Sequence, residues 1–142
     1  WHLWTAGHFP IDRRNARKTV RSVRRVIEGV RDGASLALFP EGTRTPDGRL
    51  QEFKSGAFKI ALKAGVPIVP VTIRGTFALL PKTTLAPRPG RVDVILSAPI
   101  DTRDYDERRL PELIARTKGV IEQTLSGGPP DGGLSTPATP SA

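Results

Sequence analysis

The first clear pattern of apolar residues predicts a helix over residues 15–31. Five apolar positions in this segment are spaced four, three, four and three residues apart, and they are Ala16, Val20, Val23, Ile27 and Val30. This spacing places them on one face of a helix. Asn15 or Asp12 can cap its start, and Asp32-Gly33 supplies a stop. Arginines occupy most of the other face, so the pattern predicts a basic amphipathic helix.

Three short apolar segments predict strands. Residues 36–39 form a continuous apolar run, which is typical of a strand buried on both faces, and Pro40 ends it. Residues 66–73 are apolar and β-branched but contain two prolines, so we expect an edge strand, a bulge or a strand shorter than the run. Residues 91–100 alternate well enough for a third strand. The apolar positions of that alternation are Val92, Val94 and Leu96.

Two more helices and a loop complete the predicted elements. A helix over residues 55–63 should end at Gly65 in the left-handed conformation, and residues 80–89, with three prolines, should form a loop. The last helix should begin near Pro111, a favourable residue for a first turn. We expect one side of this helix to carry Leu113, Ile114, Thr117, Ile121 and Leu125.

The order of these elements predicts one α/β domain over residues 1–125. The fold class is a mixed, largely parallel sheet flanked by helices and incomplete at the N-terminus. Polar residues that follow a buried strand are typical of ligand sites in such sheets. Residues 126–142 include thirteen Gly, Pro, Ser or Thr residues among seventeen, so we expect a disordered tail.

Composition limits the chemistry. The 142 residues contain no Cys and only two His, which excludes a disulfide scaffold, a Cys-ligated zinc site and a thiolate nucleophile, and we expect no metal site. No apolar stretch is long enough to cross a bilayer. Met is also absent and the chain opens with Trp1, so we expect a piece of a longer protein.

The segment after the first predicted strand carries the clearest candidate chemistry. Gly42 permits a tight turn that brings backbone N–H groups near a ligand. Thr43 offers a hydroxyl, and Arg44 offers a planar fork suited to phosphate or carboxylate. Glu41 can accept a hydrogen bond from a substrate hydroxyl or hold Arg44 in place. A simple turn with a surface Glu–Arg pair is an equally good interpretation from these residues alone.

Four segments, in order, resemble conserved blocks of the glycerolipid acyltransferases, the lysophosphatidic acid (1-acylglycerol-3-phosphate) acyltransferase family. Residues 39–44 (FPEGTR) resemble the third block, and residues 7–13 (GHFPIDR) resemble the second. Residues 53–57 (FKSGA) resemble the segment that follows the third block, and residues 66–71 (VPIVPV) resemble the fourth. The resemblance covers residues 7–71.

The resemblance implies an enzyme of phospholipid synthesis. Members move a fatty acyl group from a thioester, on coenzyme A or acyl carrier protein, to a hydroxyl of a glycerol-phosphate acceptor, most simply 1-acylglycerol-3-phosphate. The acyl thioester is a co-substrate, and no separate cofactor is expected. By resemblance, the acceptor's phosphate and glycerol are bound by Arg13, Glu41, Gly42, Thr43 and Arg44. Pro70 would shape the acyl or acceptor site, and Lys54 is a further cationic candidate.

One departure from the family pattern concerns catalysis. The family's catalytic block is Asn-His, four residues, then Asp, with the His acting as general base on the acceptor hydroxyl. His8 and Asp12 have only three residues between them, and His2 has Gly7 where the Asp would stand. We therefore expect the catalytic block upstream of Trp1, no catalytic residue in this chain, and no acyl transfer by the 142-residue chain alone.

The net charge of +8 comes mostly from residues 13–31, which contain eight basic residues and one acidic residue. This face can be a solvated surface over which arginine stems pack, or it can contact an anionic membrane surface. Membrane contact implies a membrane-associated protein on the cytoplasmic face. Nucleic acid is a weaker partner, because no aromatic residue interleaves with the arginines. The alternative to an enzyme is a non-catalytic basic module that binds phosphorylated ligands or nucleic acid.

Overall fold

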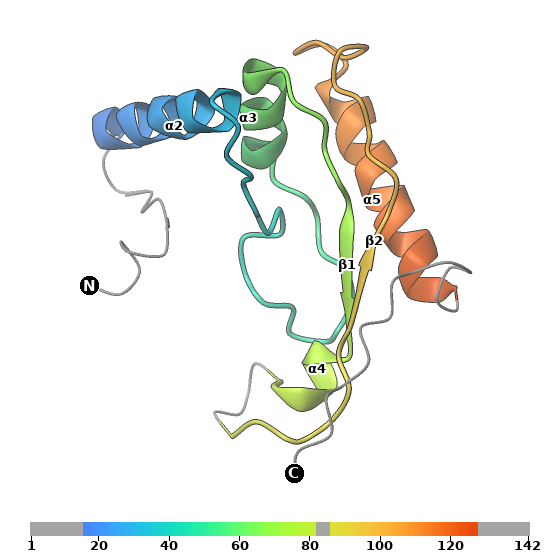
Figure 1. Cartoon of the computed structure of the whole chain (residues 1–142). Helices are drawn as coiled ribbons and strands as arrows, with labels where there is room; N and C mark the ends of the chain where they lie inside the picture. Colours follow the sequence, from blue (N-terminus) through green and yellow to red (C-terminus); the bar gives the residue numbers. More distant parts are fainter. Residues whose placement is uncertain (1–15, 82–85, 128–142) are drawn as a thin grey trace.

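The computed structural model describes residues 16–81 and 86–127. Within them, α5 runs alongside a ribbon of two strands, β1 and β2, while α3 and α4 lie toward opposite ends of the ribbon (Figure 1). The helix α2 extends outward from α3. The elements in chain order are α2 (Ala16–Arg31), α3 (Gly56–Ala64), β1 (Val71–Arg74), α4 (Thr76–Leu79), β2 (Asp93–Leu96) and α5 (Leu110–Ser126).

The three long helices confirm the sequence predictions. The first ends at the expected stop, where Gly33 has a φ of 99° and the Ala34 N–H donates to the Gly29 carbonyl at 3.0 Å. Gly65 ends α3 in the left-handed conformation, with a φ of 72°, and its N–H donates to the Ala61 and Leu62 carbonyls. Pro111 lies in the first turn of α5. The predicted tail begins where α5 ends, and residues 128–142 lie outside the described part of the chain.

The prediction of a largely parallel sheet is wrong for the described residues. β1 and β2 form an antiparallel pair in which Thr72 lies opposite Ile95, and an isolated antiparallel bridge joins Ile68 to Ile100. A parallel pair requires a long crossover, usually a helix that packs on the sheet. In its described residues, the connection between β1 and β2 instead carries only the short α4, which lies beyond the end of the ribbon (Figure 1).

The two prolines explain why the second predicted strand is short. Ladder pairing is confined to Val71–Arg74 and the bridge at Ile68, as expected for a run that proline interrupts. Pro70 itself is fully buried, and its carbonyl accepts a hydrogen bond from the Ser97 N–H at 2.9 Å. The prediction of a strand shorter than its apolar run is confirmed.

Residues 36–39 do not form the predicted buried strand. This segment has no regular secondary structure, and Leu38 and Phe39 are 41% and 75% exposed. A strand requires a neighbouring backbone that completes its ladder, and no described segment pairs with this one. An apolar run favours burial, but it does not determine which other segment will pair with it. The prediction of a buried strand at residues 36–39 is therefore wrong.

The two faces of the ribbon differ sharply in burial. Thr72 and Ile95 lie opposite each other on one face and are 1% and 8% exposed, and α5 packs against the ribbon. The opposite face is apolar but exposed, and it consists of Val71, Ile73, Val94 and Leu96. The alternation that predicted the third strand therefore marked its exposed side chains, while the buried residue of β2 is Ile95.

The core joins α5 to the start of α3. Its buried members are Phe53, Phe58, Ile100, Leu110 and Leu113. The rings of Phe53 and Phe58 stack with centroids 6.2 Å apart. Along α5 the predicted inward face holds for most positions, but Leu125 in the last turn is 39% exposed. The core therefore lies toward the N-terminal half of α5.

Two arginines cap helix C-termini. The Arg74 guanidinium donates to the carbonyls of Thr124 and Gly127 at the end of α5. The Arg31 guanidinium donates to the Lys63 carbonyl at the end of α3. Carbonyls in the last turn lack partners within the helix and carry partial negative charge, so a guanidinium supplies both the missing hydrogen bonds and a compensating positive charge.

Among the described residues, no helix has the length and apolarity required to span a bilayer.

Replacing Leu113 with Ala should destabilise the fold substantially. Its side chain is 0% exposed, and truncating a fully buried Leu typically costs about 3 kcal/mol because it leaves a cavity. The matched control is Leu125→Ala in the same helix, which should cost less than about 1 kcal/mol because that side chain is partly exposed. Urea denaturation gives both values, and equal losses would contradict the placement of the core.

Candidate functional site

The segment that carries the acyltransferase resemblance is a turn fastened to a second segment about ten residues later. The Lys54 N–H donates to the Pro40 carbonyl at 2.9 Å. The Gln51 N–H donates to Oε2 of Glu41 at 2.9 Å. The Gln51 side-chain amide donates to the Arg44 carbonyl at 3.4 Å. These contacts close residues 40–44 against residues 51–54, and we call the pair of segments the clamped turn.

Gly42 gives the clamped turn its close packing. Its φ of 72° is left-handed, and its N–H donates to the Phe39 carbonyl at 3.1 Å. A Cβ at this position would lie 3.0 Å from the Lys54 Nζ and 3.2 Å from the Lys54 Cδ. The Lys54 side chain therefore crosses the backbone at Gly42. Because the Gly42 N–H is already bonded within the turn, glycine serves the close approach of Lys54 rather than donation of that N–H to a ligand.

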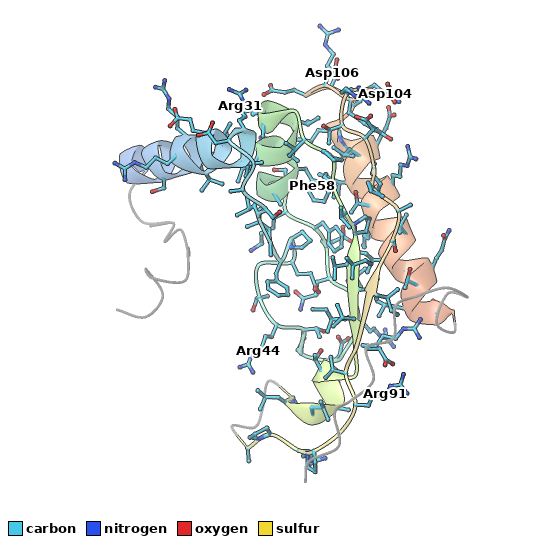
Figure 2. The ribbon with its side chains drawn as sticks, in the orientation of Figure 1. Arg31, Arg44, Phe58, Arg91, Asp104 and Asp106 are labelled. Carbon is cyan, nitrogen blue, oxygen red and sulfur yellow. The ribbon has the colours of Figure 1, made fainter. Side chains whose placement is uncertain are left out.

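Two cations of the clamped turn face solvent. The Lys54 side chain is exposed, and the Arg44 side chain is exposed and extends away from β1 and β2 (Figure 2). Within the described residues neither side chain forms a salt bridge. Thr43, the residue before Arg44, is also exposed. An ammonium and a guanidinium on one hydrogen-bonded turn form an arrangement suited to a phosphate or carboxylate.

The burial of Phe53 determines the direction of Lys54. In an extended segment, neighbouring side chains point to opposite sides. Phe53 is 9% exposed and stacks on Phe58 in the core, so the next side chain is directed outward. α3 begins directly afterwards at Gly56. The order of an aromatic residue, a lysine and a helix start thus places a cation at the edge of the core.

A second tight turn, at residues 45–49, lies between the two segments of the clamped turn. Asp47 accepts hydrogen bonds from the Thr45 hydroxyl at 3.0 Å and the Arg49 N–H at 3.1 Å. These bonds, the one from Arg49 first, hold the pKa of the Asp47 carboxyl below its usual value. Gly48 has a φ of 82°, and a Cβ there would lie 3.0 Å from the Phe77 ring. The loop that connects the two segments of the clamped turn is therefore locally ordered.

The remaining predicted site residues lie either outside the described residues or within the fold. Arg13 lies outside the described residues, as do His8 and Asp12. Pro70 is buried in the fold, and its role toward an acyl chain or acceptor stays a prediction. Glu41 is half-buried and its carboxylate accepts the Gln51 N–H. Among the described residues it forms no salt bridge with Arg44, so the expected surface Glu–Arg pair is not present.

Gln51 is a residue that sequence reasoning missed. Its main contribution is a backbone N–H, which every residue except proline possesses, so no sequence motif could mark it.

In the described ranges 16–81 and 86–127, no group of three or more His, Cys, Asp or Glu residues is placed to hold a metal ion.

Comparison with protein families identifies the family of this chain. The model of the family described as Acyltransferase matches residues 1–74, more than half of the 142-residue chain, and that span contains the whole clamped turn. The chain belongs to the acyltransferase family. The resemblance seen in the conserved blocks is thereby confirmed, and the clamped turn becomes the leading candidate for ligand binding.

Individual members of the acyltransferase family show how much of the chain is shared. A chloroplast 1-acyl-sn-glycerol-3-phosphate acyltransferase of Brassica napus is 48% identical over 81 residues, which is 57% of this chain and 24% of the relative. The 1-acyl-sn-glycerol-3-phosphate acyltransferase of Salmonella typhimurium is 34% identical over 124 residues, 87% of this chain and 50% of the relative. The matched part of the chain thus spans from 24% to 50% of the length of these relatives.

A solved acyltransferase supports the fold. The crystal structure of the 1-acyl-sn-glycerophosphate acyltransferase PlsC from Thermotoga maritima matches with a TM-score of 0.69 and 36% sequence identity. The match covers 77% of this chain and 44% of that protein. The arrangement of helices and ribbon described above is therefore shared with a member of the acyltransferase family.

Substituting Gly42 with Ala should move the Lys54 side chain, and Gly65 offers a matched control. Both glycines have a φ of 72°, but a Cβ at Gly65 would meet nothing within 4 Å. Each substitution should cost about 1 kcal/mol because of its left-handed backbone. Only Gly42→Ala should shift the NMR resonances of the Lys54 side chain. Unchanged Lys54 resonances in Gly42→Ala would show that the lysine does not cross the turn in solution.

Proposed function

We propose that this chain is the acceptor-binding part of an acyltransferase of phospholipid synthesis. In the proposed reaction a fatty acyl group passes from a thioester, on coenzyme A or acyl carrier protein, to a hydroxyl of a glycerol-phosphate lipid. The named relatives support 1-acylglycerol-3-phosphate as that lipid. The single observation that carries the proposal is that Arg44 and Lys54, two cations without a salt bridge to any described residue, lie on a hydrogen-bonded turn inside the family match.

The chemistry of the acceptor fits this pair. A phosphate monoester carries between one and two negative charges near neutral pH and has three acceptor oxygens. The Arg44 guanidinium can donate two parallel hydrogen bonds, and the Lys54 ammonium supplies a compact positive charge. Thr43 and Arg13 are the proposed further contacts to the glycerol and phosphate. A turn that is already clamped loses little conformational freedom when the acceptor binds.

Acyl transfer itself needs a group that this chain does not contain. The acceptor hydroxyl must lose its proton as it attacks the thioester carbonyl, and the thiol then leaves. The family's Asn-His-x-x-x-x-Asp block is absent from this sequence. We therefore propose that the 142-residue chain alone binds the acceptor without transferring an acyl group.

The exposed side of α2 is the proposed contact with an anionic membrane. The Arg24 side chain is 83% exposed, although it pairs with Glu28 at 3.1 Å, and Arg25 is exposed as well. Arg31 is used in capping α3 and contributes less to this side. An acceptor that carries a fatty acyl chain resides in a bilayer, so a basic surface would bring the site to its substrate. The proposed location is the cytoplasmic face of a membrane.

Removing either cation should weaken acceptor binding. Arg44→Ala and Lys54→Ala should each lower the affinity for sn-glycerol 3-phosphate by about ten- to a hundredfold, because each removes a charge-assisted hydrogen bond. Isothermal titration calorimetry measures the change. Arg108→Ala and Lys59→Ala are the controls, because both residues are exposed and lie outside the clamped turn. Equal losses in all four variants would indicate only a general effect of charge and would contradict the proposed site.

Vesicle binding tests the membrane contact. The chain should co-sediment with vesicles that contain phosphatidylglycerol. It should remain in the supernatant when the vesicles contain only phosphatidylcholine. An Arg24→Ser/Arg25→Ser variant should bind anionic vesicles at least about fivefold more weakly, since each arginine near the surface contributes about 1 kcal/mol. An Arg108→Ser/Arg116→Ser variant provides a control of equal charge. Salt-independent binding, or equal losses in both variants, would contradict an electrostatic role for α2.

A further inference from the structure

The carboxylate of Glu41 is committed to the protein backbone. It is half-buried and accepts the Gln51 N–H at 2.9 Å, a contact between residues ten positions apart. The segment between them has its own ordered turn at Thr45–Arg49. Glu41 therefore helps to close a loop at its base, together with the bonds from Lys54 to Pro40 and from Gln51 to Arg44.

We propose that Glu41 and Gln51 are positioning residues that hold Arg44 and Lys54 in place for the acceptor, and that neither of them contacts it. This inference rests on the proposed function of the clamped turn. It revises the role that the family resemblance implies for Glu41, which is direct binding of the acceptor. The observation behind it is that one residue, Gln51, bonds to both ends of the Glu41–Arg44 segment.

The bonds on either side of Glu41 show how this positioning works. Lys54, whose side chain lies across Gly42, is held by its own N–H on the Pro40 carbonyl. The backbone N–H of Gln51 donates to the carboxylate of Glu41, the residue after Pro40. The side-chain amide of Gln51 donates to the Arg44 carbonyl. If the Glu41 carboxylate is lost, the contact between residues 41 and 51 is lost and the turn retains only the bonds on either side of it. The turn is then less restrained at its centre, so we expect the separation of the two cations to vary more widely.

Charge argues for the same role. A carboxylate that faced the acceptor's phosphate would repel it, because like charges at contact distance disfavour each other. A carboxylate that accepts a backbone N–H is stabilised where it is and needs no ligand. Glu41 thus supports acceptor binding by holding the turn in place, while its carboxylate accepts the Gln51 N–H.

Two substitutions of Glu41 separate positioning from contact. Glu41→Gln keeps a side-chain oxygen that can accept the Gln51 N–H, whereas Glu41→Ala removes the acceptor. Affinity for sn-glycerol 3-phosphate should be close to that of the unaltered chain in Glu41→Gln and about three- to tenfold weaker in Glu41→Ala. Glu107→Ala, at an exposed position before α5, is the control and should bind normally. Equally weak binding by Glu41→Gln and Glu41→Ala would indicate that the ionised carboxylate itself contacts the acceptor, and would overturn the proposal.

Amide hydrogen exchange tests the clamp without any ligand. The Gln51 amide should be protected in the unaltered chain and in Glu41→Gln, and should exchange faster in Glu41→Ala. The Lys54 amide, bonded to Pro40, should stay protected in all three and so reports that the fold is intact. A Gln51 amide that is unprotected in the unaltered chain would overturn the clamp. If protection follows this pattern while no variant binds sn-glycerol 3-phosphate, the clamp stands and the proposed function fails.

Discussion

The burial of the Phe53 ring is the constraint on which the rest of the candidate site depends. Phe53 stacks on Phe58 and belongs to the core that joins α3 to α5. Because adjacent side chains in an extended segment point to opposite sides, a buried Phe53 directs Lys54 to the surface. The backbone of Lys54 is at the same time bonded to Pro40. A hydrophobic contact thus decides where the candidate cation Lys54 lies, and hydrogen bonds then hold the turn against it.

Net charge alone says little about function here, because the arginines of this chain do different work. Arg31 and Arg74 satisfy the carbonyls at helix ends. Arg103 forms an exposed salt bridge with Asp101 and holds the pKa of that carboxyl at about 2. Exposed pairs of this kind contribute little to stability. Arg44 and Lys54 differ in being presented on an ordered turn without an ionic partner among the described residues, and this is why they are the candidates for an anion.

The β ribbon shows where reasoning from hydrophobic pattern is insufficient. Apolar residues on both faces of a strand are typical of a sheet covered on both sides. In the described residues only the face carrying Thr72 and Ile95 is covered, and the side of Val71 and Leu96 is exposed. The pattern correctly indicated that these segments favour extended structure. It could not indicate strand direction, because direction depends on how the connecting segment returns and not on the side chains within the strand.

The sequence by itself determined the three long helices, the glycine stops at Gly33 and Gly65 and the family resemblance around residues 39–44. These features are local: helix periodicity, left-handed glycines and short motifs act within a few residues of chain. Tertiary structure alone decided that residues 36–39 remain exposed and that β1 and β2 run antiparallel. It also decided that Glu41 bonds to Gln51. Each of these depends on which distant backbone comes alongside, and that is settled by packing of the whole core rather than by any short segment.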